Sequence, residues 1–235
     1  MHQLTDQVYM ILRSRAFARD GRLYEDKIAK AIDYFIRENK PIKLIGFWGV
    51  GPKDVVNDSD LVVCDFLSKL NAKIKDIYLP GIEYTFIIST NHGIQNGYDT
   101  NIISSYYQSI QNVFQKHNFL FQDLETLWNK YDISLDKITD QVNKNPESWW
   151  RTINKAKALE KAAGKRSKNP NPSFSAKRYY VMRQMEKHML ETEFPNSIFH
   201  TFSDSSWNFV FPNLPTLYFW AGKRGFSNPP WFVTN

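Results

Sequence analysis

Two apolar segments of this chain each end in a loop of glycine and polar residues. The first covers Ile42 to Phe47 and leads through a glycine-rich turn to Lys53 and Asp54. The second covers Glu83 to Ser89 and leads into a loop that contains His92. Apolar runs of this length are typical of strands that are buried on both faces of a parallel sheet. The pattern predicts an α/β fold with an open, mostly parallel sheet, in which ligands bind at the carboxyl ends of the strands.

The length and composition are those of one folded domain. The chain has 235 residues, of which 42% are hydrophobic and 23% are charged, and this excludes a disordered protein. No apolar run reaches the ~20 residues of a membrane-spanning helix, so we expect no membrane partner. Cys64 is the only cysteine, and the amino terminus lacks a secretion signal. The expected location is therefore the cytoplasm.

The chain divides into four segments, which we expect to form one domain overall. Residues 1–40 carry two helical apolar stripes, and residues 41–118 form the α/β core with the loops of the site. Residues 119–193 form a helical, basic insertion, and its first part, residues 119–144, is expected to be helical throughout. Residues 194–235 alternate short apolar segments with turns, and we expect them to return to the sheet as strands or tight loops.

Positive charge is concentrated in one part of the insertion. Residues 151–187 contain eleven lysines and arginines against Glu160 and Glu186, which gives this segment a net charge of +9 and the rest of the chain −3. Such a local field attracts a phosphate-bearing partner, either a small phosphoester or a nucleic acid backbone. A solvated surface that keeps the protein soluble is the alternative.

The glycine-rich turn before Lys53 differs from the phosphate loop of nucleotide hydrolases. That loop needs a lysine directly after its last glycine and then a serine or threonine for magnesium. Here Pro52 precedes the lysine and Asp54 takes the place of the hydroxyl residue, so we exclude a nucleoside triphosphate hydrolase. The backbone amides of such a turn still suit an anion. Lys53 is a candidate to pair with a phosphate or condense with a carbonyl, and a solvent-facing lysine is the alternative.

The second loop offers a histidine and a carboxylate. His92 is a candidate general base, because imidazole titrates near neutrality, and Asp99 follows seven residues later. We expect this loop and the turn before Lys53 to face a common hollow. Asn96-Gly97 is a strong reverse-turn dipeptide, so a purely structural turn is the alternative. The chain has no His-x-His, no His-Glu-x-x-His and no cysteine pair; no cofactor is predicted, and a metal is not excluded.

The carboxyl-terminal part adds further candidates. His200 lies near two phenylalanines and is either a proton shuttle or a packed histidine. Lys223 and Arg224 are flanked by glycines, and they suit either a phosphate or carboxylate ligand or a solvated turn. Trp231 follows two prolines and is a candidate wall of a substrate pocket or a core residue.

Five short motifs follow one another along the chain. They are Phe47 to Lys53, Tyr78-Leu79-Pro80-Gly81, Asn91-His92-Gly93 to Asp99, Phe194-Pro195-Asn196-Ser197-Ile198 after a helix with Arg178 and Arg183, and Asn228-Pro229-Pro230-Trp231-Phe232. In this order they resemble the Phe-Pro-x-Lys, Tyr-x-Pro-Gly, Asp-Gly-Arg-Val-Phe-x-Asp, Phe-Pro-Asp-x-Ile and Thr-Pro-Trp-His motifs of the isocyanide (isonitrile) synthases of the pyoverdine/dityrosine biosynthesis family.

The motifs also depart from the family pattern. Lys53 comes later after the phenylalanine than in the family, and Asn91 or His92 takes the place of its aspartate. Phe199 to Ser203 replaces the family's Arg-x-Ser-Ile-His, and Phe232 replaces its terminal histidine. A relative that acts on a different amine or sugar phosphate therefore fits the sequence equally well.

The resemblance implies a Rossmann-like α/β fold and an enzyme that condenses the amine of an amino acid with a phosphorylated ketose. Under this hypothesis Lys53 is the electrostatic anchor or the imine-forming amine, and His92 or His200 moves the proton. Lys223 with Arg224, or Arg178, holds the phosphate. The residues expected to complete the substrate site are Trp48, Asp54, Tyr84, Asn91, Arg183 and Trp231.

Two other classes of function stay open from the sequence. The first is a protein that binds or modifies nucleic acid or nucleotides with the basic segment 151–187. The second is a non-catalytic interaction protein on an α/β scaffold. A homo-oligomer is compatible with each of these functions.

Overall fold

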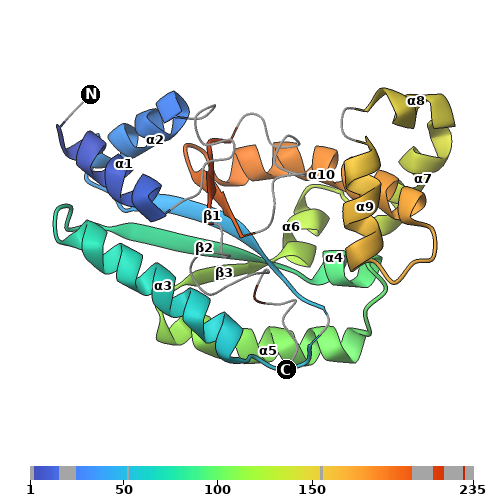
Figure 1. The fold of residues 1–235 in the computed structure, drawn as a ribbon, viewed down its shortest axis with the longest axis horizontal. Helices are drawn as coiled ribbons and strands as arrows, with labels where there is room; N and C mark the ends of the chain where they lie inside the picture. The colour runs from blue at the N-terminus through green and yellow to red at the C-terminus, as the bar shows by residue number, and fades with distance from the viewer. Residues whose placement is uncertain are drawn as a thin grey trace.

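The sheet has five strands in the described part of the chain, and all of its pairings are parallel. The computed structural model describes residues 3–15, 25–51, 53–153, 156–202, 214–219 and 230. The strand order is β3-β2-β1-β4-β5 (Figure 1). The strands are β1 (Ile42–Gly49), β2 (Ile82–Ser89), β3 (Leu120–Asp123), β4 (Ile198–Thr201) and β5 (Thr216–Tyr218). This confirms the predicted α/β fold with an open parallel sheet.

Helices precede, connect and cover the strands. Those described are α1 (Gln3–Arg15), α2 (Glu25–Arg37), α3 (Asp58–Lys75), α4 (Thr90–Gln95), α5 (Thr100–Lys116), α6 (Leu124–Lys130), α7 (Leu135–Lys144), α8 (Glu147–Thr152), α9 (Ala156–Arg166) and α10 (Pro172–Glu193). The last five form the helical insertion between β3 and β4. Each helix in the described residues is too short or too polar to cross a bilayer.

The sheet separates two hydrophobic layers. One contains buried side chains of α1, α2, α3 and α5 packed on the even-numbered residues of β1 and β2, including Trp48 and Phe86. The other contains buried side chains of α6, α7 and α10 packed on odd-numbered residues, including Phe47 and Ile87. Successive side chains of a strand point to opposite faces. Neighbouring residues at the end of β1 therefore belong to different layers.

The first two strands have the sequence that a buried parallel strand requires. Every residue of β2 except Glu83 is buried, and in β1 the accessible positions are Lys43 at its start and Gly49 at its end. Such continuous burial explains why both segments are apolar throughout and do not alternate. The prediction of both strands from these apolar runs is therefore confirmed.

The order of the strands reverses at β1. The chain runs from β1 outward to β2 and β3, and the helical insertion then returns it to β4 on the opposite side of β1. The loops that leave adjacent strands at such a point diverge and open a crevice at the carboxyl ends. The loop after β1 and helix α4 after β2 both lie at this edge.

Several local expectations were wrong. Residues 119–144 are not helical throughout, because β3 begins at Leu120. The segment after β2 is helix α4 and not a loop, so His92 lies on a helix, and Gly97, with a φ of 81°, ends the turn after it.

Candidate active site

The loop after β1 and helix α4 touch at the carboxyl edge of the sheet. A Cβ atom built on Gly93 of α4 would lie 3.1 Å from the carbonyl oxygen of Val50. A Cβ atom built on Gly51 would lie 2.7 Å from the ring of Tyr98, which follows α4. Both glycines thus permit a backbone approach that a side chain would block. The two predicted loops are neighbours, as their positions after adjacent strands indicated.

Lys53 lies in a closed network of hydrogen bonds beside α3. Its side chain is 7% exposed, and Nζ donates to Asp60 Oδ2 at 2.5 Å, to Asn57 Oδ1 at 2.8 Å and to the carbonyl oxygen of Pro230 at 2.9 Å. Burial lowers the pKa of Lys53, and the Asp60 carboxylate opposes this effect. An ammonium group has three hydrogens, and all three are donated here. In this arrangement Lys53 holds the loop to α3 and to Pro230.

The carboxylate of Asp60 extends this network into the core. Asp60 is fully buried and accepts the hydroxyl hydrogen of Tyr106 on Oδ1 at 2.5 Å. Tyr106 in turn accepts from the indole of Trp48 at 2.9 Å. Burial, with the adjacent Asp60 carboxylate, raises the pKa of Tyr106 well above its ordinary value. The network is therefore saturated, and it connects the loop after β1 to α3 and α5.

His92 belongs to a second buried polar cluster, on the other face of the sheet. Its Nε2 lies 2.7 Å from Glu186 Oε1, and Glu186 is fully buried on α10. The same oxygen accepts the indole hydrogen of Trp128 at 2.9 Å, and Oε2 accepts from Arg183 at 3.0 Å. The ring of His92 packs on Phe47, with the ring centroids 5.1 Å apart. Four elements, β1, α4, α6 and α10, thus build this cluster.

Arg183 connects the carboxylate to two aromatic rings. Its guanidinium carbon lies 4.0 Å from the ring centroid of Phe47 and 4.9 Å from that of Tyr179. It also donates to the hydroxyl of Tyr179 at 2.5 Å. A planar guanidinium suits such combined stacking and hydrogen bonding. Arg183 is 6% exposed, so it neutralises Glu186 inside the protein and does not belong to a basic surface.

The protonation state of His92 follows from its partners. Burial acts to raise the pKa of Glu186, but His92, Arg183 and Trp128 outweigh it and hold that pKa below its ordinary value. Burial is also the main cause that lowers the pKa of His92, against the raising effect of Glu186. His92 is therefore neutral at pH 7. Because an ionised carboxylate only accepts, Nε2 carries the hydrogen and Nδ1 keeps its lone pair.

The side chains of Lys53 and His92 belong to different buried clusters of the described residues. The network of Lys53 includes Trp48, whereas the cluster of His92 packs on Phe47. These two neighbours point to opposite faces of the sheet. The two side chains therefore belong to different layers of the described core, although the two backbones touch, and a common hollow between the two turns stays a prediction.

His200 is packed in the centre of the sheet. It is 1% exposed, and within the described residues neither ring nitrogen has a hydrogen-bond partner. Its ring centroid lies 5.3 Å from that of Phe86 and 5.4 Å from that of Phe202, and a Cβ atom on Gly46 would lie 2.8 Å from its Nε2. Burial lowers its pKa to about 3. Of the two roles considered, this position favours the packed histidine.

The other predicted residues are spread over the fold. Asp99 is exposed and caps α5 by accepting from the amides of Asn101 and Ile102, and Asp54 is exposed. Trp48 and Tyr84 are core residues, with relative exposures of 0% and 1%. Asn91 is buried on α4, next to His92. Lys223, Arg224 and Trp231 lie outside the described residues.

Arg178 is half-buried near the start of α10, one residue from Tyr179. Its guanidinium carbon lies 5.7 Å from the ring centroid of Phe174. Within the described residues it has no ion pair, and its Nε is buried without a hydrogen-bond acceptor. Burial lowers the pKa of Arg178 from its very high ordinary value, which leaves the group charged. Arg178 is thus a partly buried cation that has no anion in the described part of the chain.

Sequence reasoning missed Glu186 as a site residue. Glu186 is one of two acidic residues in the basic segment, and it follows Met182 by four positions and precedes Met189 by three. This spacing places it on the buried stripe of a helix, where a carboxylate needs cationic or hydrogen-bonding partners. The position of Glu186 was therefore detectable, but the identity of its partner, 94 residues away in the chain, was not.

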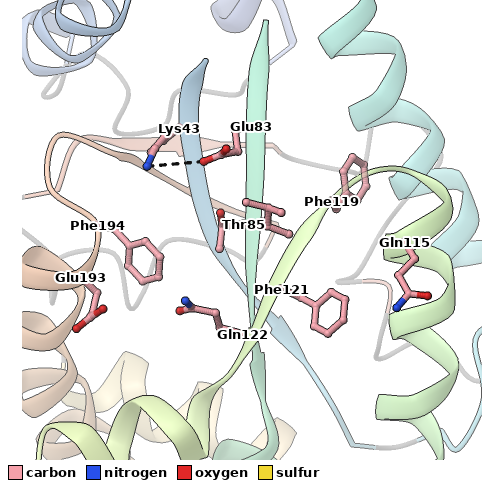
Figure 2. A pocket seen from close by; sticks show the side chains of 10 residues that line it. Lys43, Glu83, Thr85, Gln115, Phe119, Phe121, Gln122, Glu193 and Phe194 are labelled. Atoms are coloured by element: carbon pink, nitrogen blue, oxygen red, sulfur yellow. Dashed lines mark ion pairs between the residues drawn. The ribbon is translucent and has the colours of Figure 1, made fainter. Parts of the chain in front are cut away.

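A separate hollow of about 610 Å³ lies over the amino half of β1, β2 and β3 (Figure 2). Lys43 and Glu83 form an ion pair of 3.8 Å at one end of it, and Phe194, after α10, lies beside it. This hollow contains none of the predicted site residues. The described residues also hold no group of three His, Cys, Asp or Glu side chains that could ligate a metal.

Comparison with known proteins shows a similarity of fold and no similarity of sequence to a family or a curated protein. The sequence matches no protein-family model and no curated protein. The fold is similar to the crystal structure of the PvcA protein from Pseudomonas aeruginosa, with a TM-score of 0.73 and 14% sequence identity. The similarity covers 97% of this chain and 87% of that one. At this identity the likeness shows a shared fold and leaves the activity to be argued from the site.

Proposed function

We propose that the protein is a biosynthetic enzyme that joins the amine of a small molecule, an amino acid, to a phosphorylated carbonyl donor, as isocyanide synthases do. The observation that carries this proposal is the buried pair of His92 and Glu186 at the carboxyl edge of the sheet. The motifs that resemble this family support it. The fold shared with PvcA supports that family at the level of architecture.

His92 is proposed as the general base. Its Nε2–H is directed to Glu186, so Nδ1 is the acceptor that receives a proton from the ammonium of the substrate. The freed amine then attacks the carbonyl carbon of the donor; a C–N bond forms, and the C=O π electrons move to the oxygen. His92 returns its proton to that oxygen, which gives a carbinolamine whose nitrogen still carries the positive charge. Loss of water from this adduct yields a protonated imine.

Glu186 and Arg183 are proposed as positioning residues. The carboxylate fixes the tautomer of His92 and stabilises the imidazolium that forms when Nδ1 is protonated. Arg183 keeps Glu186 ionised, because it donates to Oε2 at 3.0 Å inside the protein. Trp128 donates to Oε1 at 2.9 Å and holds the carboxylate in place. Lys53 receives no chemical step, because its three hydrogens are already donated.

Arg178 is proposed to bind the phosphate of the donor. Among the described residues this partly buried guanidinium has no anion, which is unfavourable, and a phosphate would satisfy it with paired hydrogen bonds. The neighbouring residue, Tyr179, contacts His92, with the ring centroids 5.7 Å apart. The turn of α10 that carries Arg178 therefore lies beside the proposed base.

The test is mass spectrometry of small molecules that co-purify with the protein. For the wild type we expect a bound amino acid or sugar phosphate, and for Arg178→Gln we expect the sugar phosphate to be lost. Lys157→Gln is the matched control, because Lys157 is an exposed cation on α9. Equal retention of the sugar phosphate in all three proteins would exclude Arg178 as its ligand.

The alternative function, nucleic acid binding, is favoured by one observation. Lys157, Lys161 and Lys165 are exposed on α9. Against it, Arg183 is buried, and Lys177 forms an ion pair with Glu147. Retention on heparin that falls steeply with salt, together with nucleotide fragments among the co-purifying molecules, would favour this alternative over an enzyme of small molecules.

A further inference from the structure

We propose that Arg166, whose carbonyl oxygen accepts from Tyr98, and Lys168, whose ammonium lies over the ring of Tyr98, form an anion-binding rim for the phosphate of the co-substrate at the carboxyl edge of the sheet. This inference rests on the proposed function and names a second contact for the same ligand group. It is carried by the way in which the end of α9 is fastened to the turn after α4.

Two hydrogen bonds fasten the end of α9 to this turn. The hydroxyl of Tyr98 donates to the carbonyl oxygen of Arg166 at 2.8 Å. The amide of Lys168 donates to the carbonyl oxygen of Asn96 at 2.8 Å. These two bonds fix the positions of both backbones relative to each other. Figure 1 shows the same arrangement, with α9 beside α4 at the end of the sheet where β1 and β2 finish.

The ring of Tyr98 connects this turn to the loop after β1. On one side the ring lies against Gly51, where a Cβ atom would be 2.7 Å away. On another side the ammonium of Lys168 lies over the ring, 5.2 Å from its centroid. A cation–π contact of this kind leaves the ammonium hydrogens free to donate. The positive charge is thereby held beside the loop where ligands of this fold class bind.

The local charge favours an anion. No acidic residue occurs between Glu160 and Glu186, whereas Lys165, Arg166 and Lys168 lie within four positions of one another. The carboxylate closest in sequence to Tyr98, that of Asp99, accepts two amide hydrogens at the start of α5. The negative charge of Asp99 therefore lies at the amino terminus of α5, where the helix dipole stabilises it. The negative charge and the acceptor oxygens of a phosphate suit a surface where two cationic side chains follow one another.

The rim also explains why the basic segment needs a fixed position. Exposed lysines that only maintain solubility need no specific contacts with the rest of the protein. Here the end of α9 is bonded to Asn96 and Tyr98, directly after the helix that carries His92. The contacts place part of the segment's charge at the edge that holds the proposed base.

The test measures the affinity for ribose 5-phosphate as a probe, by titration calorimetry at constant ionic strength. We expect the double variant Arg166→Gln/Lys168→Gln to weaken binding at least tenfold. The control variant Lys157→Gln/Lys161→Gln removes the same charge from exposed positions of α9 and should stay within twofold of the wild type. Tyr98→Phe keeps the ring but loses the hydrogen bond to Arg166, and we expect it to fall between these values.

Two results would overturn the rim. One is equal weakening by both double variants, which would mean that only the overall field matters. The other is unchanged binding in Arg166→Gln/Lys168→Gln, with its fold verified by circular dichroism. Neither result tests the proposed chemistry. If Arg166→Gln/Lys168→Gln condenses the amine with an unchanged KM for the phosphorylated donor, the proposed function stands and the rim fails. If the rim binds phosphate but no amine is condensed, the rim stands and the proposed function fails.

Discussion

Replacement of His200 by leucine should make the protein less sensitive to acid. The imidazole is 1% exposed among aromatic rings, and burial lowers its pKa to about 3. In the unfolded chain the same group has a pKa of about 6.5. Below pH 6.5 the unfolded chain therefore binds a proton that the folded protein does not bind. Stability must fall as the pH falls through this range, down to the folded pKa.

The size of this effect follows from the two pKa values. Each pH unit below 6.5 removes about 1.4 kcal/mol of unfolding free energy until the folded pKa is reached. Between pH 7 and pH 5 the loss from His200 alone is about 1.9 kcal/mol. His200→Leu removes this contribution. The contribution of His92, whose pKa is also lowered by burial, stays in both the wild type and the variant. The difference in acid-induced loss of unfolding free energy between wild type and variant therefore comes from His200. The substitution also removes two buried nitrogens without partners in the described residues, which should raise stability at pH 7 by about 1–3 kcal/mol.

The assay is urea unfolding at pH 7 and at pH 5, followed by tryptophan fluorescence. Trp48 and Trp128 are buried and report on both layers of the core. We expect the wild type to lose about 1.9 kcal/mol more than His200→Leu between the two pH values. An identical loss in both proteins would refute the reasoning, because it would mean that His200 is protonated or hydrogen-bonded in the folded state.

Three further predictions concern the same two layers. Lys53→Met should lower the unfolding free energy by about 3 kcal/mol, because it leaves the buried Asp60 without its cation. Lys43→Met breaks only the surface pair with Glu83, so in the same denaturation assay it should change the unfolding free energy by less than about 1 kcal/mol. Gly46→Ala should unfold at a much lower temperature than the wild type, since its Cβ would lie 2.6 Å from the His200 carbonyl oxygen. Gly164→Ala in α9, whose Cβ would lie 3.5 Å from Pro172, should be neutral or stabilising by about 0.5–1 kcal/mol. Equal melting temperatures of the two variants would contradict the packing described. Glu186→Gln should lower turnover and shift the acid limb of its pH profile downward, because His92 loses the carboxylate that raises its pKa; an unshifted profile would argue against the pair.

The core of the fold was predictable because its two central strands are buried on both faces. Continuous apolar runs identified β1 and β2, and the glycines after them indicated loops at the carboxyl edge. The edge strand β3 was not predictable in this way. It has four residues, of which Leu120 and Gln122 are exposed, so no apolar run marks it.

The candidate site was only partly predictable, for two physical reasons. His92 was identified from its position after β2, but its partner Glu186 comes from α10 and meets it only through the packing of the insertion on the sheet. Lys53 was assigned to the same hollow because the loops are neighbours. Phe47 and Trp48 point to opposite faces of the sheet, so the cluster of His92 and the network of Lys53 lie on opposite faces as well. The alternation of side chains at the end of β1 would have predicted this separation.

The most direct test of the account is the turnover of His92→Gln with an amino acid and a sugar phosphate donor that the wild type condenses, followed by mass spectrometry of the adduct. His188→Gln is the matched control, because His188 is an exposed histidine on α10. If Nδ1 of His92 takes the proton of the amine, His92→Gln should lose a factor of about 10²–10⁴ in kcat while it remains folded, and His188→Gln should match the wild type. Wild-type turnover in a folded His92→Gln protein would contradict the assignment of this cluster as the active site.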